Sequence, residues 1–88
     1  MMRKNDELIK LIDVRSAKEY TDTHVPGAVN IPVENLDDMA NAFTKDDMIV
    51  CVCNHGGHRS QNAARLLHNK GFKNTFYLEG GVAGWFAR

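Results

Sequence analysis

The sequence predicts an α/β fold in which a small parallel sheet of about four strands is flanked by helices on both faces. Short apolar segments alternate along the chain with segments of helical spacing, and the connections between them are short. The chain has 88 residues, of which 43% are hydrophobic, which fits one core and one domain spanning residues 1–88.

The expected strands are short and apolar or β-branched. The run MIVCVC is too short for a typical helix and has no polar residue, as expected of a fully buried parallel strand. A turn at Pro26-Gly27 precedes the second strand, and Pro32 ends it. In chain order, the expected strands span residues 8–14, 28–31, 48–53 and 75–78.

The expected helices have recognisable starts and ends. Ser16 followed by Glu19 is a capping box, and Ser60 is expected to cap the third helix, which Gly71 ends. In the second helix the apolar residues recur at helical spacing: Leu36, Met39, Ala40 and Phe43. The expected helices span residues 17–21, 34–43, 60–70 and 82–86, the last after a turn at Gly80-Gly81.

Charge and hydropathy narrow the function classes. Lysines and arginines number 11, as do aspartates and glutamates, so the sequence offers no electrostatic case for nucleic acid or an anionic membrane as partner. No run approaches the ~20 apolar residues of a bilayer span. Residues 1–7 are charged and lack the apolar stretch of a signal peptide, so a cytoplasmic location is the expectation.

The two cysteines, Cys51 and Cys53, are too close on one strand for an unstrained disulfide. We therefore expect at least one of them to have a chemical role. A buried core cysteine is the simplest alternative for the other. A metal site built from Cys51, Cys53, His55 and His58 is a further alternative, although a buried strand would turn Cys51 into the packed sheet.

The loop after Cys53 has the features of an anion cradle. In open α/β sheets ligands lie beyond the carboxyl ends of the strands, which is where Asp13, Arg15 and this loop fall. Successive backbone N–H groups, the positive end of the following helix and the charge of Arg59 all favour a thiolate. Such a thiolate can attack the outer sulfur of an anionic donor, or phosphorus or arsenic in an oxyanion. The competing interpretation is a core cysteine before an ordinary strand-to-helix loop.

Three ordered motifs stand out along the chain. They are residues 11–15 (LIDVR) with Glu19-Tyr20 and the later segment 24–32 (HVPGAVNIP), residues 49–53 (IVCVC), and residues 80–85 (GGVAGW). In this order they resemble the rhodanese family in its single-domain form. The second motif selects Cys53 over Cys51 as the nucleophile. Together the motifs cover nearly the whole chain.

The resemblance implies a sulfurtransferase that needs no metal or organic cofactor. Cys53 would take sulfane sulfur from thiosulfate or a related small anionic donor and pass it to cyanide, a thiol or a protein acceptor. Asp13 and Arg15 would support the loop, with Ser60 beside it. The residues implied to hold the donor are Asn54, His55, Gly56, Gly57, His58 and Arg59.

The sequence departs from the family pattern in two places. Arg59 follows Cys53 by six positions instead of the usual five, a spacing found in rhodanese-like phosphatases and arsenate reductases, and this keeps oxyanion chemistry open. The N-terminal edge strand is short or missing, so either the first residues or a second chain would cover that edge, and monomer and homodimer both stay open. A non-enzymatic redox or partner-binding module is the third alternative.

Overall fold

The computed structural model describes residues 3–4, 7–55 and 57–86. Its sheet is built from β2 (Glu7–Asp13), β3 (Val29–Asn30), β4 (Met48–Val52) and β5 (Thr75–Tyr77), which pair in parallel in the order β3-β2-β4-β5. A further short strand, β1 (Arg3–Lys4), pairs antiparallel with the first two residues of β2. The N-terminal residues therefore supply backbone partners at the start of β2.

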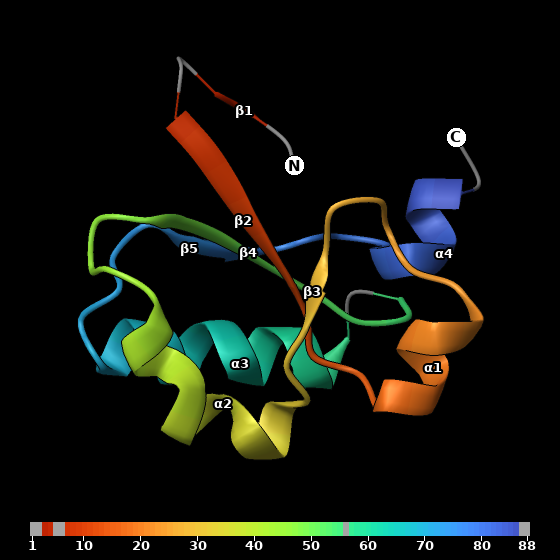
Figure 1. The fold of residues 1–88 in the computed structure, drawn as a ribbon, viewed down its shortest axis with the longest axis horizontal. Coiled ribbons are helices and arrows are strands. Elements are labelled where there is room, and N and C mark those ends of the chain that lie inside the picture. Colours follow the sequence, from red (N-terminus) through yellow and green to blue (C-terminus); the bar gives the residue numbers. More distant parts are fainter. Residues whose placement is uncertain (1–2, 5–6, 56, 87–88) are drawn as a thin grey trace.

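The helices cover both faces of the sheet, as the sequence predicts (Figure 1). On one face, α2 (Val33–Met39) and α3 (His58–Asn69) pack on the larger apolar cluster, which includes Ile12, Ile49 and Cys51. On the other, α1 (Ala17–Asp22) and α4 (Gly81–Phe86) contribute to a smaller cluster around Leu11 and Val52. Alternate residues of β2 and β4 thus belong to opposite cores, because successive side chains of a strand point to opposite faces.

Two expectations about the helices are corrected by the structure. Residues 34–43 do not form one helix: α2 ends at Met39 and a 3-10 turn, η1 (Ala40–Ala42), follows. Met39 is exposed, whereas Leu36 and Ala40 are buried. Ser60 does not cap α3, because the helix begins at His58 with Gly57 as its N-cap, and the Ser60 hydroxyl is directed elsewhere. The capping box of Ser16 and Glu19 is confirmed.

The segments that follow β2, β4 and β5 begin at the same end of the molecule, because these strands are parallel. Figure 1 shows the loop after β4 at the right-hand side, between α1 and α4, at the carboxyl end of β2 and β4. Among the described residues, no helix has the length and apolar character needed to cross a bilayer. The carboxyl end of the sheet is the place to look for chemistry, as the sequence indicates.

Candidate active site at the carboxyl end of the sheet

Cys53 is the first residue after β4 and lies in the loop that leads into α3. Its thiol is nearly buried, with 3% of the residue exposed. The Gly57 amide nitrogen lies 3.2 Å from the sulfur, and the Ser60 hydroxyl oxygen lies 3.1 Å from it. The same loop lines a surface pocket of about 280 Å³ that includes Cys53. The sulfur is therefore held at the base of a pocket by donors from the loop and the first turn of the helix.

The surroundings of Cys53 stabilise its thiolate. Burial alone raises the pKa of this thiol, but hydrogen bonds from the Ser60 hydroxyl and from the backbone amides of Ser60, Gly57 and His55 outweigh burial, so that the pKa of Cys53 is lowered. Cys51 is in the opposite situation: it is fully buried in the apolar cluster, and burial raises its pKa to about 12. Of the two cysteines, Cys53 is therefore the one whose surroundings favour the thiolate, the nucleophilic form.

The Ser60 hydroxyl has two partners and one proton. Its oxygen lies 3.1 Å from the Cys53 sulfur and 3.2 Å from the Gly57 carbonyl oxygen. While Cys53 is a thiol, its S–H can donate to Ser60, whose own O–H then donates to Gly57. When Cys53 is a thiolate, the hydroxyl can turn and donate to the sulfur. Ser60 thus adapts to either protonation state of Cys53.

The start of α4 fixes the direction of the loop peptides. The Val82 amide donates to the Cys53 carbonyl at 2.9 Å, and the Ala83 amide donates to the Asn54 carbonyl at 3.0 Å. In a trans peptide the C=O and N–H groups point in opposite directions. Because α4 binds the Asn54 carbonyl, the next N–H, that of His55, points away from α4 and toward the sulfur.

This close contact depends on Gly81. Its φ is +59°, and a Cβ built there would lie 2.2 Å from the Cys53 carbonyl oxygen and 2.6 Å from Asn54 backbone atoms. From the sequence, Gly80-Gly81 was placed in a turn and in the third motif, but this close contact with the loop was not predicted. The signal in the sequence is the pair of glycines at the start of the last helix.

Asp13 and Arg15 form a buried ion pair beside the loop. Asp13 is fully buried and Arg15 is 3% exposed, and the Arg15 Nη2 lies 2.7 Å from the Asp13 Oδ2. The other guanidinium fork nitrogen, Nη1, donates to the Asn54 Oδ1 at 2.8 Å. The side chain of Asn54 therefore joins the loop to the end of β2, while its backbone carbonyl joins the loop to α4.

Glu19 of α1 is a site residue that sequence reasoning missed. Its carboxylate accepts two hydrogen bonds from Arg59, at 2.8 and 3.1 Å, and one from the Asn54 Nδ2 at 2.8 Å. The hydrogen bonds from Arg59, followed by those from the Ser16 backbone and hydroxyl and from Asn54, hold the pKa of Glu19 well below its usual range despite some desolvation. The sequence offered two signals for Glu19, the capping box, which explains the bond to Ser16, and the Glu19-Tyr20 pair of the first motif, and neither predicts the contact with Arg59.

The remaining loop residues contribute less specific features. His55 and His58 are exposed and line the pocket. Gly57 also lines it, and a Cβ there would meet nothing within 4 Å. Gly56 lies outside the described residues. Within the described part of the chain, no three His, Cys, Asp or Glu side chains are grouped so that they could hold a metal ion.

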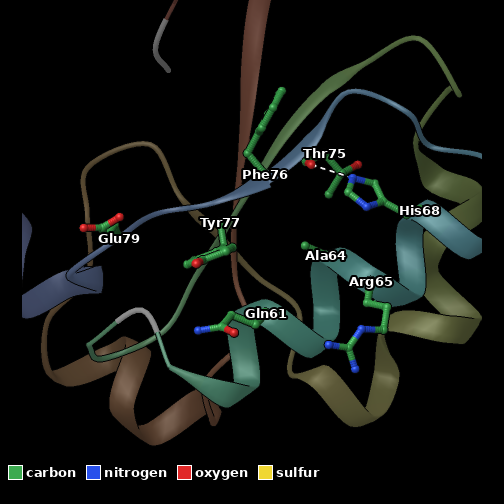
Figure 2. Close-up of a pocket in the computed structure, with 8 residues that line it drawn as sticks. All are labelled: Gln61, Ala64, Arg65, His68, Thr75, Phe76, Tyr77 and Glu79. Carbon is green, nitrogen blue, oxygen red and sulfur yellow. Dashed lines mark hydrogen bonds between the residues drawn. The ribbon is translucent and has the colours of Figure 1, made fainter.

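A larger pocket, of about 530 Å³, lies between α3 and β5 (Figure 2). Figure 2 shows Gln61 and Arg65 from the helix on one side of it and Tyr77 from the strand on the other. The ring of His68 at its margin is already hydrogen bonded to the Thr75 carbonyl oxygen at 2.7 Å. Its described lining residues include no cysteine, so size does not make this pocket the better candidate for nucleophilic chemistry.

Comparison with known proteins gives a consistent result. A family model described as "Rhodanese-like domain" matches residues 1–88. The chain is 37% identical over 81 residues to a putative sulfur carrier protein, YrkF, of Bacillus subtilis, covering 92% of this chain and 43% of that protein. It is 35% identical over 77 residues to the thiosulfate sulfurtransferase GlpE of Shewanella oneidensis, covering 88% of this chain and 75% of that one.

Solved structures agree with the sequence comparisons. A rhodanese-like domain from Anabaena superposes with a TM-score of 0.84 at 31% identity, covering 91% of this chain and 92% of that one. The human single-domain sulfurtransferase TSTD1 superposes with a TM-score of 0.83 at 26% identity, covering 91% and 82%. The fold expected from the sequence is thereby confirmed.

Proposed function

The chain belongs to the rhodanese-like domain family, and we propose that it is a sulfurtransferase in which Cys53 carries sulfane sulfur as a persulfide. The observation that carries the proposal is the surroundings of the Cys53 sulfur, where loop amides and the Ser60 hydroxyl lower the pKa of the thiol. Relatives named as thiosulfate sulfurtransferases and as a putative sulfur carrier support the same chemistry. The chain spans less than half of that putative sulfur carrier, so activities of the longer protein enter here only as proposals.

The proposed cycle has two steps. The Cys53 thiolate attacks the outer sulfur of the donor; an S–S bond forms to Cys53, and the donor's own bond to that sulfur breaks, with the electron pair leaving on the donor fragment. With thiosulfate the fragment is sulfite. In the second step an acceptor, either cyanide or a thiolate, attacks the terminal sulfur and the Cys53 thiolate is released. Charge balances in both steps without an external oxidant or reductant.

The loop amides suit both states of the cysteine. The Gly57 and His55 N–H groups face the thiolate, and they would remain within reach of the terminal sulfur of a persulfide anion. The Ser60 hydroxyl can donate to either anion. A small donor and a thiol or protein acceptor are the proposed partners, and the proposed location is the cytoplasm. Monomer and homodimer both stay open.

Oxyanion chemistry, of the phosphatase or arsenate reductase kind, is the second candidate. It is favoured by the six-position spacing between Cys53 and Arg59. Against it, both fork nitrogens of Arg59 are bound to Glu19, so the arginine that would clamp a tetrahedral anion already holds a carboxylate. A role in redox sensing or partner binding without catalysis is the third candidate. In that role the lowered pKa of Cys53 would not serve catalytic turnover.

Thiocyanate production separates these candidates. The protein is incubated with thiosulfate and cyanide, and in parallel with an aryl phosphate. The sulfurtransferase proposal predicts thiocyanate from the wild type and from Cys51→Ala, the matched control, and none from Cys53→Ala. Turnover of the aryl phosphate without thiocyanate would instead support the phosphatase. No turnover of either, together with no sulfur transfer from an organic persulfide, would leave the non-catalytic module.

A further inference from the structure

Among the described residues that line the Cys53 pocket, the one permanent cation is Arg59, and its guanidinium is bound by Glu19. The pocket is lined by Cys53, Asn54, His55, Gly57, His58 and Arg59. The Nη1 and Nη2 of Arg59 bind the two carboxylate oxygens of Glu19 at 2.8 and 3.1 Å. This two-point geometry matches the guanidinium fork, which is the same surface that an oxyanion would use.

The neighbouring charges are paired as well. Arg15, which contacts the loop through Asn54, is neutralised by the buried carboxylate of Asp13 at 2.7 Å. The two arginines that belong to the loop or contact it are therefore each paired with a carboxylate, Arg15 with Asp13 and Arg59 with Glu19. The attraction left for a donor comes from the loop amides, which are dipoles, together with the first turn of α3.

Such a pocket discriminates between donors by charge. Thiosulfate is a dianion with its second charge on the sulfonate group. That charge gains little attraction from Arg59 while Glu19 is bound to the guanidinium, and thiosulfate would have to displace Glu19 to bind there. An organic persulfide carries its single charge on the sulfur that is transferred. That charge can be met by the amides that already face the Cys53 sulfur.

We propose that Glu19 is a specificity-determining residue that neutralises Arg59 and so favours organic persulfides over thiosulfate as sulfur donors. The proposal rests on the proposed function. In the favoured step the Cys53 thiolate attacks the outer sulfur of R–S–S⁻; the Cys53–sulfur bond forms, the donor S–S bond breaks, and the electron pair leaves as the thiolate R–S⁻. The reactants carry two negative charges in total, and so do the products.

Glu19→Gln tests the proposal. The amide keeps the size of the side chain and one acceptor oxygen for Arg59, but it removes the charge. We expect KM for thiosulfate to fall about fivefold with kcat little changed, the factor that matches about 1 kcal/mol for a partly exposed ion pair. The rate with the persulfide of 2-mercaptoethanol, whose only strongly acidic group is the transferred sulfur, should stay within about twofold.

Two controls define the origin of the effect. Asp47→Asn removes a carboxylate paired to Lys10 at 3.1 Å, away from the pocket, and should change neither donor's kinetics. Arg59→Ala added to Glu19→Gln should abolish the gain with thiosulfate, because no freed guanidinium remains.

The outcomes separate the two proposals. An equal loss with both donors in Glu19→Gln, or an unchanged KM for thiosulfate, would overturn the role of Glu19 while leaving sulfur transfer intact. A wild-type protein that takes sulfur from neither donor would instead overturn the proposed function.

Discussion

The contact between α4 and the nucleophile loop is tested by Gly81→Ala. Gly81 has φ of +59°, and its Cβ would lie 2.2 Å from the Cys53 carbonyl oxygen. The obstructing atoms are backbone on both sides, so no side-chain rotation relieves the overlap. The first turn of α4 must withdraw from the loop, and the hydrogen bonds from Val82 and Ala83 to the loop carbonyls break.

The size of the effect follows from these contacts. A residue with a Cβ in the left-handed region costs about 1 kcal/mol. Each lost hydrogen bond costs about 1 kcal/mol net. The sum is about 3 kcal/mol, a large share of the roughly 5–15 kcal/mol that stabilises a typical domain. Because the His55 amide is no longer directed at the sulfur, the pKa of Cys53 should rise as well.

Urea denaturation followed by circular dichroism measures the free energy of unfolding of Gly81→Ala. Gly84→Ala is the matched control in the same helix: its Cβ would meet only the Glu79 carbonyl oxygen, at an ordinary 3.7 Å, and its stability should be equal to or slightly above that of the wild type. If the free energy of unfolding of Gly81→Ala lies within about 0.5 kcal/mol of that of the wild type, the spread expected for substitutions away from such constraints, α4 does not fix the loop.

Three further predictions follow from the charges at the site. Alkylation of Cys53 by iodoacetamide should rise with pH around a midpoint below that of an ordinary cysteine, and Ser60→Ala should shift that midpoint upward; an unchanged midpoint in the variant would rule out the hydroxyl as a donor to the thiolate. Asp13→Asn should lower the free energy of unfolding by about 3 kcal/mol or more, because Arg15 stays buried without its counter-ion, and a loss below 1 kcal/mol would contradict this. The pKa of Glu19 is lowered in the folded state, so its stabilisation is complete above the unfolded pKa of about 4.3 and is lost as the pH falls below it. The stability difference between wild type and Glu19→Gln should therefore be constant from neutral pH to about 5 and narrow on further acidification, whereas a gap that widens would contradict the sign.

The sequence predicted the sheet well because the strands of the parallel sheet are marked by local patterns. The apolar run before Cys53 could be little else than a buried strand, and the structure places it between β2 and β5. The motif at the start of the last helix was equally visible. Where local signals competed, the prediction was wrong: Ser60 is a residue type typical of an N-cap, but α3 begins two residues earlier at His58, and the Ser60 hydroxyl contacts the Cys53 sulfur, seven positions away.

The candidate site was predicted in part, for a related reason. Cys53 and its loop are contiguous in the chain, so the nucleophile and its cradle could be inferred from one short segment. Glu19 lies 40 positions from Arg59, and the bond between them exists only because α1 lies against the loop in the folded chain. The pairing of β1 with the start of β2 was one of two alternatives left open for that edge, because two charged residues carry no strand signal of their own.

Whether Cys53 carries sulfane sulfur can be measured by peptide-resolved mass spectrometry after a single exposure to a sulfane-sulfur donor. We expect one sulfur atom to be gained on the peptide that contains Cys53, to be removed by cyanide, and still to be gained when Cys51 is replaced by alanine. Sulfur found on Cys51, or a protein that gains no sulfur while Cys53 is reduced and the fold is intact, would contradict it.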